Sequence, residues 1–120
     1  MSRKIPEYDV FQLSHGLVLE IYKITRQFPD EERYGLSLQM RRSSSSIPMN
    51  LAEGGAREGS KEFRYFVNIA IGSCGEISYQ LKLAYDLGYI SKNDNDNLID
   101  QYNIIVKMLM NLHKKLKSNS

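Results

Sequence analysis

The chain has 120 residues, of which 42% are hydrophobic and 25% charged, and its formal net charge is +2. These values are those of an ordinary single globular domain, and so small a charge does not by itself imply a nucleic-acid partner. A single cysteine excludes an intramolecular disulfide framework. The chain has no secretory signal and no apolar run long enough to cross a membrane, so we expect a cytoplasmic protein without membrane contact.

The first predicted helix covers residues 9–28, after an N-terminal tail, residues 1–8, that we expect to be loose. Asp9 can cap the start of the helix, and Pro29 disfavours helical geometry at Phe28. The apolar residues between them recur every three or four positions, which is the helical period. They are Val10, Leu13, Leu17, Ile21, Ile24 and Phe28.

The second predicted helix covers residues 34–55 and contains Pro48. Proline removes one backbone hydrogen bond and crowds the preceding turn, so we predict a kink, with the hydroxyls of Ser44 or Ser45 satisfying the freed groups. A break into two shorter helices at Ser46 is the alternative. Gly54 and Gly55 are expected to supply a left-handed residue that ends the segment.

Two further helices are predicted, over residues 60–87 and 91–116. The helix over residues 60–87 has one apolar stripe that faces the core and a second stripe on nearly the opposite side. The second stripe must be covered by other helices of a wide bundle or by another subunit. Gly88 ends this helix, and Tyr89 can fold back onto Ala84. The last helix has an apolar seam for helix packing. Because no β-hairpin signal occurs, the fold class is all-α.

Several segments resemble a known family, the bacterial four-helix bundle proteins, also called 23S rRNA intervening-sequence proteins. The resemblance covers nearly the whole chain. Its main segments are Phe28–Leu36, Gln39–Ser43, Ser46–Gly54, Glu62–Phe63 and Ile69–Ser73, and the match continues at Leu81, Ala84, Leu87, Gly88 and Tyr89.

The resemblance implies a single four-helix up-down bundle, with the proline-kinked helix second, that assembles into a ring-shaped homo-oligomer, a pentamer. Some members of the family are encoded inside rRNA genes, and most have no established activity. The accessory protein of diversity-generating retroelements, which binds nucleic acid and a reverse transcriptase, is similar. This chain departs from the family by its serines at Ser43–Ser46, which are expected to make the surface beside the paired arginines more polar, and by Cys74 and Gly75 inside a helix.

The second stripe of the third helix is the predicted oligomer interface. Its candidate residues are Tyr65, Ile69, Tyr79 and Leu83. One stripe of a helix this long can face the core of its own bundle, so the other is free to pack against a second copy.

A nucleic-acid face is predicted around the second helix. Across residues 33–64 six basic residues stand against three acidic ones, a balance of +3. Arginine suits phosphate because its fork donates two parallel hydrogen bonds. The candidate residues are Arg41, Arg42, Arg57, Lys61 and Arg64, with a second basic cluster at Lys107, Lys114, Lys115 and Lys117.

The alternative is that these charges are solvated on helix faces, or that they form structural ion pairs. Glu53 and Glu76 are the carboxylates in the most apolar surroundings, and their candidate partners are Arg41, Arg42 and Arg57.

No catalytic or metal site is predicted. Di-iron bundles need a Glu-x-x-His motif, which the positions before His15 and His113 lack. Cys74 could act as a nucleophile with either histidine as its base, but a lone cysteine on a core stripe is typically a small buried hydrophobic residue. We therefore expect no enzyme and no cofactor.

The leading hypothesis is a non-enzymatic, oligomeric accessory protein that binds nucleic acid, RNA in preference to DNA. The alternative is a self-assembling scaffold that binds a protein partner and has no nucleic-acid role.

Overall fold

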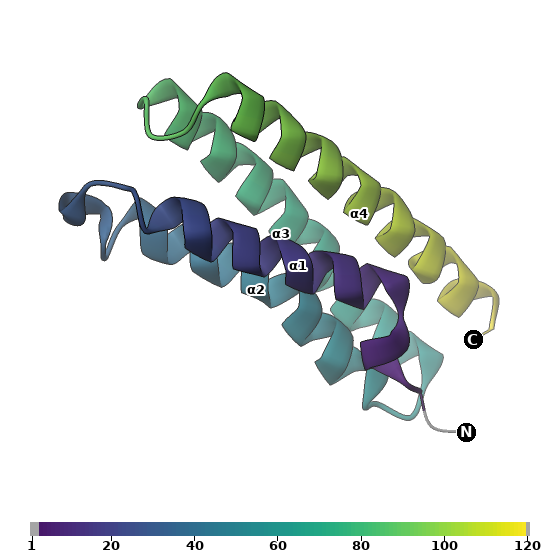
Figure 1. The fold of residues 1–120 in the computed structure, drawn as a ribbon. Coiled ribbons are helices and arrows are strands. Elements are labelled where there is room, and N and C mark those ends of the chain that lie inside the picture. The colour runs from purple at the N-terminus through teal and green to yellow at the C-terminus, as the bar shows by residue number, and fades with distance from the viewer. Residues whose placement is uncertain (1–2, 120) are drawn as a thin grey trace.

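The computed structural model describes residues 3–119, and within them it contains four α-helices, two short 3-10 helices and no strand. The α-helices are α1 (Asp9–Thr25), α2 (Leu36–Gly55), α3 (Ser60–Asp86) and α4 (Lys92–Ser118), with η1 (Ile5–Glu7) and η2 (Asp30–Glu32). They run up and down in a bundle of 46 × 23 × 20 Å (Figure 1). The predicted all-α four-helix bundle is confirmed.

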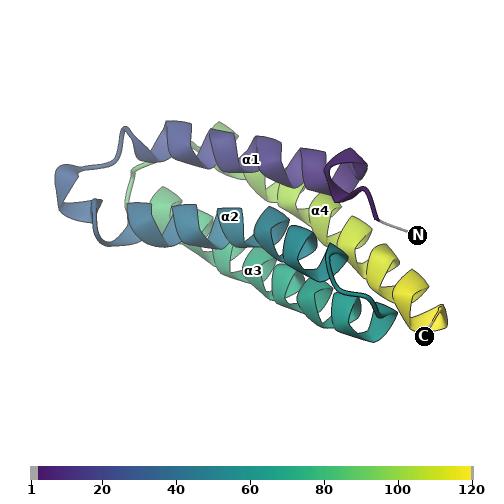
Figure 2. The same ribbon diagram turned by 90° about the horizontal axis from the view of Figure 1, so that it is seen from below.

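The bundle has two ends of different composition. Figures 1 and 2 show the α1–α2 connection, with η2, beside the α3–α4 connection at one end, which we call the η2 end. The α2–α3 connection, the start of α1 and the end of α4 lie at the other, which we call the terminal end. No helix of the described chain is long and apolar enough to span a membrane.

Helix α1 ends at Thr25, three residues before the predicted limit. The amides of Gln27 and Phe28 bond to carbonyls only three residues back, at 3.1 and 3.2 Å, so the last turn tightens and the chain leaves the helix. Phe28 is buried, and its ring lies 5.1 Å from that of Tyr89 in the α3–α4 connection. The packing of Phe28 across the η2 end accounts for the early stop.

Helix α2 is continuous through Pro48, so the alternative of a break at Ser46 is wrong, while the kink stays a prediction. The hydroxyls of Ser44 and Ser45 donate to the Arg41 carbonyl, at 3.2 and 2.7 Å, rather than to the Ser44 carbonyl that Pro48 leaves without its helical donor. Ser43 and Ser44 are also buried, which corrects the expectation of a polar surface. Small side chains here let α2 approach its neighbours, and Ser46 accepts a 2.8 Å hydrogen bond from Ser73 of α3.

Helices α3 and α4 form the predicted antiparallel pair. The Tyr89 amide donates to the Ala84 carbonyl at 2.9 Å, and Gly88 takes the left-handed conformation, with φ of +80°, that this closure requires. Ser91 caps α4 by accepting from the Asp94 amide at 3.0 Å. Most residues of the predicted stripes lie in the core, but Phe66 and Leu112 are only partly buried. The buried ones are Phe63, Val67, Ala70, Cys74, Ile77, Leu81 and Ala84 from α3, and Leu98, Tyr102, Ile105, Leu109 and Leu116 from α4.

The N-terminal tail is the largest difference from the prediction. Residues 1 and 2 lie outside the described chain, but the following residues fold as η1, and Ile5 is only 4% exposed. The Ile5 side chain lies where a Cβ on Gly55 would be, and a Cβ on Gly54 would lie 2.7 Å from Phe66 and 2.9 Å from Phe63. Neither glycine is left-handed. Their missing side chains admit η1 and α3, which corrects the expected role of this pair.

Candidate functional site

Arg41 lies at the η2 end and joins α2 to the last turn of α1. Its Nε donates to Thr25 Oγ1 at 2.8 Å, and its Nη2 donates to the Tyr22 carbonyl at 3.4 Å. The guanidinium also stacks on the Tyr22 ring, 4.6 Å from its centroid. These partners are uncharged, so the predicted pairing of Arg41 with Glu53 or Glu76 is wrong and its charge is not neutralised by a carboxylate.

Arg41 shares a pocket with two arginines that the sequence did not single out as a group. A cavity of about 200 Å³ is lined by Arg26, Arg33 and Arg41, with Asp30 as its one carboxylate. The remaining lining residues are Thr25, Phe28, Pro29 and Ser37. Since η2 reverses the chain between α1 and α2, basic residues on both sides of Pro29 converge. The predicted helix end before Pro29 is the sequence feature from which this group of three arginines could have been predicted.

Glu32, also in η2, serves the backbone and a neighbouring loop. Its Oε1 accepts from the Leu36 amide at 3.1 Å, and its Oε2 accepts from the Tyr89 hydroxyl at 2.9 Å. The second bond raises the pKa of Tyr89, because ionised tyrosine could not donate to the carboxylate. Glu32 therefore fixes the η2 turn to the α3–α4 connection.

Arg57 lies at the terminal end. Its Nη2 donates to Glu53 Oε1 at 2.6 Å, and its guanidinium lies 5.1 Å from the Phe66 ring centroid. About half of the Glu53 side chain is exposed, and Glu76 is exposed as well. The ion pair of Glu53 with Arg57, one of the predicted pairings, is therefore present. The expectation that Glu53 and Glu76 occupy apolar surroundings is wrong, because both lie on outer helix faces.

The five predicted nucleic-acid contacts do not form one surface. Arg41 and Arg57 are sixteen residues apart along α2 and its end, or about 24 Å at the helical rise. Arg42 is exposed near Arg41, whereas Lys61 and Arg64 lie in the first turns of α3 with Arg57. The structure therefore divides the predicted face between the two ends.

The terminal end instead unites two clusters that the sequence keeps far apart. Helix α3 begins and antiparallel α4 ends there, so Lys61 and Arg64 share this end with the C-terminal lysines (Figure 1). In residues 3–9, 53–64 and 111–119, eight basic residues stand against five acidic ones, a balance of +3. In residues 22–42 and 80–97, at the η2 end, the balance is seven against six, or +1.

The predicted oligomer interface lies on one outer face of α3. At about 100° per residue its four residues fall within about 80° of arc. Tyr65 and Tyr79 are 62% and 64% exposed, Ile69 is at the limit of exposure, and Leu83 is partly buried. Gly72 lies on the same face, and a Cβ on it would meet nothing within 4 Å. The face is exposed and largely apolar, although Glu76 falls within the same arc, and the missing side chain of Gly72 leaves room for close approach.

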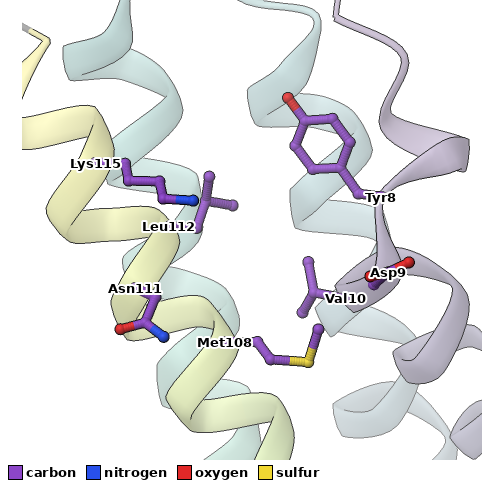
Figure 3. Close-up of a pocket in the computed structure, with 7 residues that line it drawn as sticks. All are labelled: Tyr8, Asp9, Val10, Met108, Asn111, Leu112 and Lys115. Atoms are coloured by element: carbon purple, nitrogen blue, oxygen red, sulfur yellow. The ribbon is translucent and has the colours of Figure 1, made fainter.

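A cavity of about 410 Å³ lies between the start of α1 and the end of α4. Figure 3 shows Val10 and Met108 facing one another across it. Its rim carries Asp9 and Lys115, and its lining contains no histidine or cysteine. This set can bind an apolar group but holds no nucleophile with an adjacent base. Its lining residues are Tyr8, Asp9, Val10, Met108, Asn111, Leu112 and Lys115.

Within the part of the chain that the structure describes, Cys74 makes no hydrogen bond to a histidine. Cys74 is fully buried, and burial raises the pKa of its thiol to about 12, which keeps it in the unreactive neutral form. His15 is exposed on α1 and stacks with Phe11. Among residues 3–119 no group of three histidine, cysteine or acidic side chains could hold a metal ion.

Comparison with known proteins identifies the family. The chain is similar to a crystal structure of a protein of unknown function from the S23 ribosomal protein family of Bacteroides thetaiotaomicron VPI-5482, with 24% identity and a TM-score of 0.81. The match covers 88% of this chain and 95% of that one, and at this identity it establishes the fold alone. No curated protein matches. The family described as 23S rRNA-intervening sequence protein matches residues 6–111, and the chain belongs to that family.

Proposed function

We propose that this protein is a non-enzymatic, oligomeric accessory protein that binds nucleic acid, RNA in preference to DNA, mainly through its terminal end. The observation that carries the proposal is the gathering of basic side chains from α3 and α4 at that end, with a balance of +3. The family description, which refers to 23S rRNA, agrees with an RNA partner.

The exposed basic side chains at the terminal end support a phosphate-binding surface rather than a pocket for one base. Lys61, Lys114 and Lys115 are exposed, and Arg57 keeps part of its guanidinium at the surface beside Glu53. The start of α3 adds the positive end of its dipole. Arg41 contributes less in this proposal, since its guanidinium holds α1, and Arg42 lies too far along α2 to reach the same strand segment.

Self-assembly through α3 multiplies the effect of this modest charge. The exposed stripe of Tyr65, Ile69 and Tyr79 gives a second copy an apolar face. Gly72 costs helix stability, about 1 kcal/mol relative to alanine, without relieving any contact within its own chain. A neighbouring copy packed on this face would account for it. In a ring such as a pentamer, the terminal end recurs around the axis and the fields add.

The assembly is tested by the mass of the particle in solution. Ile69→Asp places a charge in the stripe and is expected to release monomers, measured by light scattering after size exclusion. The matched control is Asn103→Asp, at an exposed position of α4 away from the α3 stripe, which should leave the mass unchanged. A wild-type monomer, or equal masses for both variants, would remove the α3 interface.

Nucleic-acid binding is tested by fluorescence anisotropy with single-stranded RNA on the nuclease-treated, sized oligomer across a salt series. We expect a log–log slope of several units, because several phosphates release their counterions together. DNA of the same sequence should bind more weakly. Absence of binding at low salt would exclude the proposal and leave the protein-binding scaffold, for which the apolar cavity between α1 and α4 is the favoured contact.

A further inference from the structure

We propose that the pocket at the η2 end binds a single phosphate dianion, either inorganic phosphate or the phosphate of a small monoester. This site is independent of the nucleic-acid surface proposed above, which lies at the opposite end of the bundle.

The charge of the pocket matches a dianion. Three arginines and one aspartate line it, which leaves two positive charges. No carboxylate of the described chain lies within 4.0 Å of the guanidinium nitrogens of Arg26, Arg33 or Arg41. The C-terminal dipole of α1 offsets part of the charge on Arg41, and the other two arginines are exposed at the mouth.

The donors of the pocket are partly preorganised. Two of the five N–H groups of Arg41 are used, by Thr25 and by the Tyr22 carbonyl, which leaves three. Those same bonds hold the guanidinium in place, so ordering it costs little entropy when a ligand binds. The Ser37 hydroxyl lies in the same lining and can donate to a phosphate oxygen.

The surroundings of the pocket favour a small ligand over a polymer. Asp30 and Glu31 are exposed in η2, and the whole η2 end carries a balance of only +1. A nucleic-acid strand extending beyond the pocket would place its further phosphates beside these carboxylates. A cavity of about 200 Å³ accommodates one phosphate group with a small substituent.

The test follows the arginine side-chain N–H signals by NMR during titration with inorganic phosphate at low salt. Wild type should show saturable shifts of Arg26, Arg33 and Arg41, with tighter binding at pH 8 than at pH 6 as phosphate becomes a dianion. Sulfate, a dianion at both values, should lack this pH dependence. Phenyl phosphate distinguishes the sources: affinity equal to or above that of inorganic phosphate indicates a monoester site, and weaker binding indicates free phosphate.

Variants locate the site. Arg26→Gln and Arg33→Gln are each expected to weaken phosphate binding about tenfold, the loss of one charge-assisted hydrogen bond. Asp30→Asn should strengthen binding, because it removes the one negative charge of the lining. The control is Arg42→Gln, whose side chain does not line the pocket. Shifts confined to the terminal end, or equal affinities for all four variants, would overturn the proposal whether or not RNA binds.

Discussion

The two ends of this bundle carry similar numbers of arginines and lysines but use them differently. At the η2 end, Arg41 is bonded to Thr25 and Tyr22 of α1 and opens onto a small pocket with two further arginines. At the terminal end, the basic residues come from the start of α3 and the end of α4, and we propose that they act together as one surface. A guanidinium acts locally where neutral groups hold it in a cavity, and collectively where many charges share an open face.

At the terminal end α2 packs closely on α3, and a substitution at Gly54 tests this contact with the largest expected effect. A Cβ at Gly54 would lie 2.7 Å from Phe66 Cβ and 2.9 Å from Phe63 Cδ1. Gly54→Ala is therefore expected to lower the free energy of unfolding by about 1–3 kcal/mol, measured by urea denaturation. Gly16→Ala, in an open stretch of α1, should raise it by about 0.5–1 kcal/mol. An unchanged free energy of unfolding in Gly54→Ala would contradict the close packing of α2 on α3.

The structural role of the η2 end is tested by comparing adjacent arginines. Arg41→Met removes the bond to Thr25 Oγ1 and the stacking on Tyr22, and is expected to cost about 1–2 kcal/mol of unfolding free energy. Arg42→Met, at an exposed site, should change it by less than about 0.5 kcal/mol. Equal values for the two variants would mean that Arg41 does not hold α1 to α2.

The middle of the bundle, between the two charged ends, buries Cys74, and the pH dependence of stability tests whether this site excludes charge. Burial raises the pKa of Cys74 from its ordinary 9.0 to about 12. The unfolded chain loses this proton first, so stability is unaffected below pH 9 and falls as pH rises toward 12, by about 1 kcal/mol between pH 8 and pH 10. Cys74→Ala should lack this component. If the free energy of unfolding had the same pH dependence in wild type and in Cys74→Ala, the core would not disfavour the Cys74 thiolate.

The smallest expected effect concerns the N-terminal segment at the terminal end. The Arg3 guanidinium donates to the Gly55 carbonyl at 3.3 Å and to the Arg57 carbonyl, and it lies 4.7 Å from the Phe63 ring centroid. Arg3→Met should lower the unfolding free energy by about 0.5–1 kcal/mol and speed hydrogen exchange in η1. Lys4→Met, at an exposed neighbour, serves as the control. Unchanged exchange in the Arg3 variant would show that η1 is held by Ile5 alone.

Patterns within one helix were predictable from the sequence. Helical periodicity located the four helices to within a few residues at each end, and the turn at Gly88 followed from the conformational freedom of glycine. Where Phe28 packs across the η2 end, the helix limit moved by three residues. Local signals could not include that contact, because Tyr89 is sixty-one residues away in sequence.

Features that depend on contacts between segments distant in sequence were not predictable from the sequence. Gly54 and Gly55 looked like a helix stop, but they lack side chains because η1 and α3 pack there. The serines of α2 looked like a polar surface, but two of them lie in the helix interface. Likewise, residues 33–64 form one basic segment in the sequence. In the structure, the length of α2 places the arginines of this segment at opposite ends of the bundle.

The most direct test of the account compares RNA binding after equal loss of charge at each end. The terminal-end variant is Lys61→Gln with Lys114→Gln, and the η2-end variant is Arg26→Gln with Arg42→Gln. All four side chains are exposed, so both proteins should fold. In an anisotropy salt series, the account predicts that the terminal-end variant loses about tenfold or more in affinity, with a salt slope shallower by about 1.4, while the η2-end variant stays near wild type. Equal losses, or a larger loss at the η2 end, would contradict it.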